Sequence, residues 1–244
     1  SNMKSLLQTL SAALSLCSNT IAILSNRTLQ FQASRKVRKF VVAITCYLFT
    51  LGFATANATT ILEMDIDKIA ADAEFVFEGE VINSETRQDS NSGIISTYAT
   101  FRINDVVKGD YSADTVELKF MGGAFNGQIV QVSGMRIPEL GEQGIYFVES
   151  MSRELINPLI GWSQGHFIIV DDDGVRRIST TDNKPVTEVN AVSSIPSSIK
   201  KPLSVVEGST DIAAGVVTES SALMIQRALT VEEFKTRITS IIEN

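Results

Sequence analysis

The feature that most constrains the fold is a two-residue alternation within Ile95–Val107. A repeat of two residues is typical of a β-strand with one buried face and one polar face. Such a strand needs paired neighbours, so we expect a mainly β protein. The alternating set that should be buried is Ile95, Thr97, Ala99, Phe101 and Ile103.

Further strands are predicted along the chain, separated by glycine, proline and polar residues. The polar stretch Arg87–Gly93 predicts a hairpin loop, and Lys108-Gly109-Asp110 predicts a turn. Asp171-Asp172-Asp173-Gly174 joins two apolar runs and predicts a hairpin with an Asp-Gly turn. These further strands are expected at 75–81, 115–121, 127–132, 145–150, 166–170 and 175–179.

Two helices are expected at the ends of this β-rich region. Apolar residues at helical spacing predict a short amphipathic helix over 65–73. A longer helix is predicted over 231–242, where Thr230 and Glu233 match a capping box. The domain expectation is therefore a β domain over 59–180, linker or irregular cover over 181–228, and a C-terminal helical segment over 229–244.

The segment 37–58 has the pattern of a secretory signal peptide. Basic residues flank its start, the apolar run 40–54 follows, and Ala56-Asn57-Ala58 fits a small-residue cleavage site. Residues 1–36 are expected to be an expression scar followed by a non-native or wrongly assigned leader. Translation would then begin at Val37, and the mature chain would be periplasmic or extracellular.

A retained membrane anchor is the alternative for 40–54. That run has about 15 residues, which is short of the roughly 20 that span a bilayer. After cleavage we expect no stable membrane span.

Cleavage after Ala58 would also remove both cysteines, Cys17 and Cys46. The mature chain would then have no disulfide, no cysteine zinc site and no cysteine nucleophile. It would also carry a net charge near −13, because all six basic residues of the leader are lost with it. Phosphate binding needs clustered Lys and Arg, so nucleic acid is not an expected partner.

Three segments carry a resemblance to a known family. They are Ala73–Val81 (AEFVFEGEV), Tyr98–Gly109 with its closing Lys-Gly, and Leu140–Phe147 (LGEQGIYF). In this order the segments are similar to the netrin-like/TIMP-like OB-fold modules, over about residues 64–170. The resemblance implies an OB-like antiparallel barrel and a protein that interacts with or inhibits a secreted protease. TIMPs, however, place an N-terminal cysteine on the protease zinc. The expected mature N-terminus here is Thr59-Thr60-Ile61, so inhibition by that route is not expected.

Catalytic chemistry finds little support in the residue types. His166 is the only histidine, and Ser163 nearby lacks the G-x-S-x-G elbow of a serine nucleophile. No catalytic residue and no cofactor is therefore expected, although an enzyme of unrecognised class stays as a third alternative. A metal site is not expected either; Asp171 and Asp173 are a weak alternative that lacks EF-hand spacing.

One local cluster could recognise a ligand. Trp162, Gln164 and His166 lie in a segment bracketed by Gly161 and Gly165, and they include the only Trp and the only His of the chain. An indole, an amide and an imidazole together can recognise a ligand; the alternative is that Trp162 simply caps the core. We therefore expect an exported, non-catalytic binding module whose partner is an unknown protein or small ligand.

Overall fold

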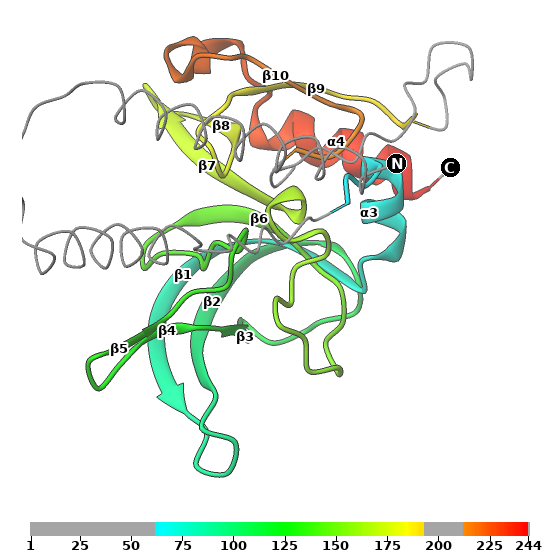
Figure 1. The fold of residues 1–244 in the computed structure, drawn as a ribbon. Helices are drawn as coiled ribbons and strands as arrows, with labels where there is room; N and C mark the ends of the chain where they lie inside the picture. Colours follow the sequence, from blue (N-terminus) through cyan, green and yellow to red (C-terminus); the bar gives the residue numbers. More distant parts are fainter. Residues whose placement is uncertain (1–61, 193–211, 244) are drawn as a thin grey trace, which may run out of the picture. The chain divides into compact units, whose positions relative to one another are not determined.

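The computed structural model describes residues 62–192 and 212–243, so the expected signal peptide at 37–58 and the leader at 1–36 lie outside the described residues. The described part is mainly antiparallel β, with a short helix at each end (Figure 1). The helices are α3 (Ile66–Asp72) and α4 (Val231–Ile242), with 3₁₀ turns η1 (Trp162–Gly165) and η3 (Ala222–Arg227).

Six strands form the main sheet, in the order β3-β2-β1-β6-β7-β8. All neighbouring strands in it are antiparallel. Two further pairs, β4–β5 and β9–β10, form small sheets of their own. The strands are β1 (Phe75–Gln88), β2 (Ile95–Lys108), β3 (Thr115–Met121), β4 (Gly123–Phe125), β5 (Gln128–Val130), β6 (Gln143–Val148), β7 (His166–Asp172), β8 (Val175–Thr180), β9 (Val186–Val189) and β10 (Val216–Thr218).

The central strands are buried on both faces, which divides the apolar side chains into two cores. On β6, Tyr146 and Val148 face one core, while Ile145 and Phe147 face the other. The first core also contains the alternating residues of β1, β2 and β3. The second is covered by α3, α4 and the strands β7 to β9, as Figure 1 shows. The pleat sends successive residues to opposite faces, so one strand serves both cores.

The expected closed barrel is not found among the described residues. The main sheet ends at β3 and β8, and no strand pairing joins these two ends. Irregular segments cover both edges instead. At the β3 edge, Met121 donates its N–H to Ile156 O. At the β8 edge, Arg177 forms an isolated β-bridge with Thr230. Loops and the cap of α4 thus pair with part of the backbone of both edge strands, and the sheet stays open.

Most predicted elements are confirmed. Strand β2 has the expected alternation, and β7 and β8 are joined through Asp173 and Gly174, which both have positive φ (51° and 83°), as a type I′ turn requires. The capping box of Thr230 and Glu233 is also present. The loop predicted at 87–93 begins only after Gln88, because β1 continues through that residue.

Two regions differ from the expected pattern. The strand predicted at 127–132 is shortened to β5, and it pairs with β4, which was not predicted. The described part of 181–228, expected as linker or irregular cover, contains β9, β10 and η3. Val186 and Val189 of β9 are buried in the core, so this region covers it with paired strands.

Candidate functional site

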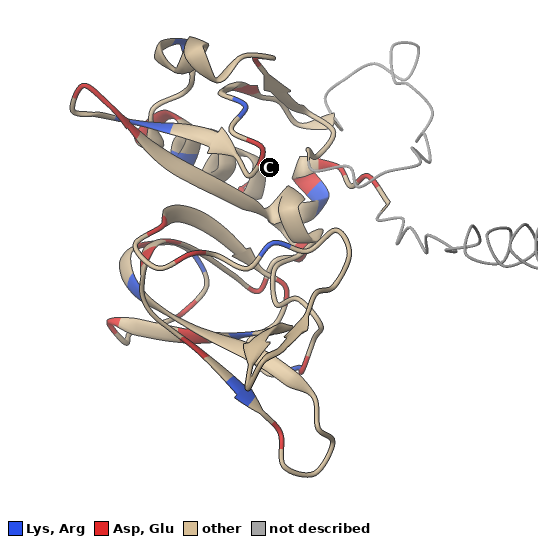
Figure 2. Cartoon of the chain, turned by 60° about the vertical axis from the view of Figure 1, so that its left-hand side comes forward, with Lys and Arg blue, Asp and Glu red and all other residues tan. Residues whose placement is uncertain are grey.

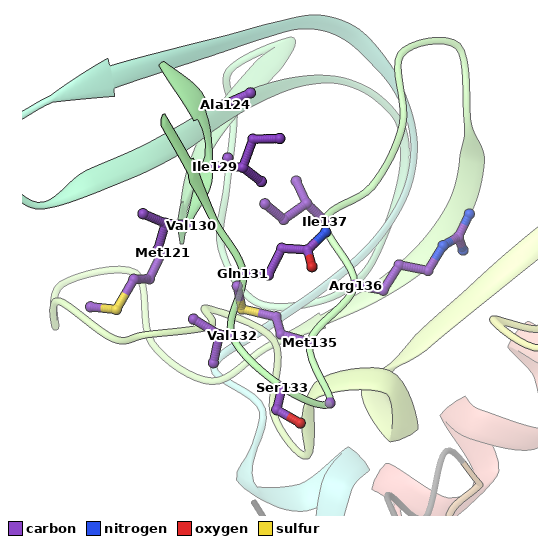
Figure 3. A pocket seen from close by; sticks show the side chains of 12 residues that line it. Met121, Ala124, Ile129, Val130, Gln131, Val132, Ser133, Met135, Arg136 and Ile137 are labelled. Carbon is purple, nitrogen blue, oxygen red and sulfur yellow. The ribbon is translucent and has the colours of Figure 1, made fainter. Parts of the chain in front are cut away.

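An open pocket of the described chain lies beside the hairpin β4–β5. It has a volume of about 620 Å³ and is bounded by the hairpin and by the loop 131–137, which follows β5 (Figure 3). Asn126 and Gly127 close the hairpin with positive φ, so β5 folds back tightly along β4 and leaves the loop beside it.

The lining of this pocket is mainly apolar. Its large apolar side chains are Met121, Ile129, Val130, Val132, Met135 and Ile137. Ile129 is 73% exposed and Val130 is 39% exposed, although both lie in a strand. The polar side chains of the lining are those of Gln131, Ser133 and Arg136. A mainly apolar hollow with few polar groups is the usual character of a small-molecule site.

A buried polar cluster lies next to this loop and contains Arg136, Glu142, Tyr146 and His166. Glu142 accepts hydrogen bonds through Oε1 from the Tyr146 hydroxyl (3.2 Å) and from His166 Nε2 (2.6 Å). Its other oxygen, Oε2, lies 2.8 Å from Arg136 Nη2. His166 and Tyr146 are almost fully buried, with exposed fractions of 1% and 0%. One carboxylate therefore connects a pocket-lining arginine to strands β6 and β7.

The ionisation of the cluster follows from these contacts. Burial alone raises the pKa of Glu142, but the hydrogen bond from His166 and the charges of His166 and Arg136 lower it by more, so the net pKa is lowered. Burial is also the main reason that the pKa of Tyr146 is raised, and the neighbouring Glu142 carboxylate adds to it. Glu142 is thus a carboxylate at neutral pH, and Tyr146 is a neutral donor.

The contact between Arg136 and Glu142 is close but poorly aligned. Arg136 Nη1 and Glu142 Oε2 are both buried without a hydrogen-bond partner, although the two residues are at ion-pair distance. The Arg136 side chain is still 31% exposed, whereas that of Glu142 is 6% exposed. Arg136 is therefore the member of the cluster that can reach solvent most easily.

The structure separates the three residues predicted to bind a ligand. The side-chain amide of Gln164 is occupied, because its Oε1 accepts from Met64 N (2.8 Å) and its Nε2 donates to Leu62 O (3.1 Å). His166 pairs with Glu142 instead, and Trp162 is half-buried with a positive φ of 58°. None of the three lines the pocket beside β4–β5. Their role in binding stays a prediction.

Ser163 is buried, and the Nε2 partner of His166 is Glu142. Asp171 Oδ1 accepts from Gly174 N (3.0 Å) within the β7–β8 turn, and Asp173 occupies a left-handed position of that turn. Among the described residues, no group of three or more His, Cys, Asp or Glu side chains is arranged to hold a metal ion.

Sequence reasoning missed Arg136, Glu142 and the pocket itself. Glu142 falls in a segment, Leu140–Phe147, that was noted only for its resemblance. The one available signal was an acidic residue directly before the apolar strand β6, and that signal is weak because acids also flank most exposed strands.

Comparisons with models of protein families, with curated proteins and with solved structures gave no match. The function must therefore be argued from the site itself. Within the described residues, no helix is both long and apolar enough to cross a membrane.

Proposed function

We propose that this chain is an exported, non-catalytic binding module that holds a small apolar molecule in the pocket beside β4–β5. The observation that carries the proposal is the pocket's size and lining. A volume of about 620 Å³ lies within the range of small-molecule sites, and six large apolar side chains line it. Exposed Ile129 supports this reading, because an apolar side chain at the rim loses contact with water when a ligand binds.

The distribution of charge supports the same class of ligand. Arg136 is the only charged residue in the pocket lining, and it is paired with Glu142. In Figure 2, Lys and Arg are spread along the described chain among acidic residues, and Arg176-Arg177 is the one adjacent pair there. Polyanion binding needs clustered Lys and Arg, so this distribution on the described residues favours an uncharged apolar ligand over nucleic acid.

The OB-like relationship is part of the proposal. The strand order β3-β2-β1-β6 is compatible with an OB-type arrangement in which a long bent first strand pairs on both sides. Register shifts in β1, between Glu78 and Gly79 and between Val81 and Asn83, support it, because bulges bend a strand. Interaction with a secreted protease, implied by the TIMP-like resemblance, remains the second proposal.

Titration of Nile red, an uncharged apolar dye, into the full chain tests the binding proposal. We expect saturable binding with an increase in fluorescence. Ile129→Asp should weaken it by about tenfold or more, because burying a carboxylate in an apolar site is costly. Leu223→Asp is the matched control, since Leu223 is 86% exposed on η3 and lies outside the pocket. Equal weakening by both substitutions, or no binding, would refute the proposed pocket.

A further inference from the structure

The buried cluster connects the pocket loop to the only histidine of the chain, His166, through Glu142. Histidine changes charge between about pH 5 and 8, unlike the other common side chains. His166 lies at the inner end of the cluster and Arg136, on the pocket loop, lies at the outer end. Figure 3 shows the Arg136 side chain leaving the pocket lining, with its guanidinium directed away from the apolar side chains.

The groups that face His166 are few within the described part of the chain. Glu142, from the segment before β6, contacts the ring through Nε2, and Tyr146 of β6 packs against the ring with centroids 5.1 Å apart. Arg136 reaches His166 only through Glu142. Because a carboxylate can only accept, Nε2 must carry the proton when the ring is neutral.

Protonation of His166 changes the charge balance of this buried site. With a neutral ring, the charges of Arg136 and Glu142 cancel. With a charged ring, two cations compete for the buried Glu142 carboxylate, which is unfavourable, because the other carboxylate near Arg136, Glu139, is 79% exposed and lies 3.8 Å away. His166 is buried and its Nε2 lies 2.6 Å from Glu142 Oε1, so the ring stays paired with Glu142. Arg136 is partly exposed and its contact with Glu142 Oε2 is poorly aligned, so Arg136 is the cation that separates from the carboxylate.

We infer that protonation of His166 releases Arg136 from Glu142 and loosens the loop 131–137, so that the pocket binds its apolar ligand less tightly in acid. The ligand-binding part of this inference rests on the proposed function. The loosening of the loop does not, because it concerns only the contacts within the chain.

Amide hydrogen exchange of the full chain without ligand tests the loop directly. Peptides covering 131–137 are followed at about pH 7.5 and about pH 5.5, with rates corrected for the intrinsic pH dependence of exchange. We expect the opening equilibrium of this loop to rise about fivefold or more in acid, as for a typical coupling between sites. The β7–β8 turn at 173–174 serves as the internal reference and should show no such change.

Two variants assign the effect to the cluster. His166→Gln keeps a donor for Glu142 but cannot be protonated, so the pH response of the loop should disappear. Arg136→Met keeps the stem of the side chain and should leave the loop equally open at both pH values, and Arg153→Met is its exposed control. An unchanged wild-type loop, or a full pH response in Arg136→Met, would overturn the inference even where His166→Gln fails to fold.

The Nile red titration separates this inference from the proposed function. Binding at about pH 7.5 that weakens about fivefold or more at about pH 5.5 supports both. Loop loosening without dye binding at either pH supports the cluster mechanism and refutes the pocket. Dye binding that is equal at both pH values, with no change in loop exchange, refutes the mechanism and leaves the pocket standing.

Discussion

Glu142 Oε1 lies 2.6 Å from His166 Nε2, and both side chains are almost completely buried. The other oxygen of Glu142 faces Arg136, whose stem lines the pocket. A single carboxylate thus joins the pocket loop to the strands β6 and β7. The stability and the pH behaviour of the loop should both depend on this residue.

Glu142→Gln should destabilise the protein by about 3 kcal/mol, because it removes the nearer carboxylate of Arg136, which is the buried one. Urea unfolding at neutral pH, followed by the fluorescence of Trp162, the only tryptophan, measures the change. Glu139→Gln is the matched control: this carboxylate is 79% exposed and lies 3.8 Å from the same arginine. Its substitution should cost less than about 0.5 kcal/mol. Equal losses of unfolding free energy in the two variants would contradict a larger contribution from the buried pair.

The lowered pKa of Glu142 also gives stability a pH dependence with a definite sign. Its folded pKa is below the ordinary value of 4.5, so its contribution is complete above that value and is lost as pH falls through the folded pKa. Wild-type protein should therefore lose stability below about pH 4.5 more steeply than Glu142→Gln, in urea unfolding repeated at decreasing pH. Parallel curves for the two proteins would contradict this assignment.

Lys235 of α4 attaches the C-terminal helix to the sheet. Its Nζ lies 2.9 Å from Glu78 and from Asp105, and 3.1 Å from Glu232. Burial lowers the pKa of Lys235, but the hydrogen bonds to these three carboxylates outweigh it, so the net pKa is raised. Glu78 is 3% exposed and keeps a second partner in Arg176.

Lys235→Met should therefore cost about 2 kcal/mol, the size of a hydrogen bond to a charged group, and less than the loss of a sole partner. Arg237→Met, an exposed cation on the same helix, should change the unfolding free energy by less than about 0.5 kcal/mol. Thermal and urea unfolding of both variants provide the comparison. If Lys235→Met left the unfolding free energy unchanged, apolar packing alone would hold α4 on the sheet.

Thr230 begins α4 by accepting from Glu233 N (3.2 Å), while the Glu233 side chain accepts from Thr230 N (2.8 Å). Thr230→Ala should cost about 1 kcal/mol, because a backbone N–H of the first turn loses its acceptor. Thr236→Ala, in the exposed middle of the helix, should be neutral or slightly stabilising, since Ala is the better helix former. In urea unfolding, the midpoint of Thr230→Ala should lie below that of Thr236→Ala, and the reverse order would contradict the prediction.

The sequence predicted the parts of the fold that local patterns determine. The alternation in Ile95–Val107, the Asp173-Gly174 turn and the cap at Thr230 each depend on neighbouring residues, and all three are confirmed. The openness of the sheet depends on which distant segments cover its edges. Ile156 beside β3 and Thr230 beside β8 do this, and no short-range pattern reveals either contact.

The site was harder to predict for the same reason. Trp162, Gln164 and His166 were grouped because they are close in sequence, but their side chains have different partners. His166 pairs with a glutamate 24 residues away, and Gln164 with Leu62, which is 102 residues away. The pocket loop carries ordinary residues whose arrangement depends on the hairpin β4–β5, and β4 has only three residues.

Amide hydrogen exchange of the full chain, with and without saturating Nile red at neutral pH, tests the location of the binding site most directly. If the ligand occupies the pocket beside β4–β5, protection should appear in peptides covering 121–137 and should be absent from those covering 162–166. Protection of 162–166 without any change in 121–137 would contradict the proposed pocket and would return the site to Trp162, Gln164 and His166.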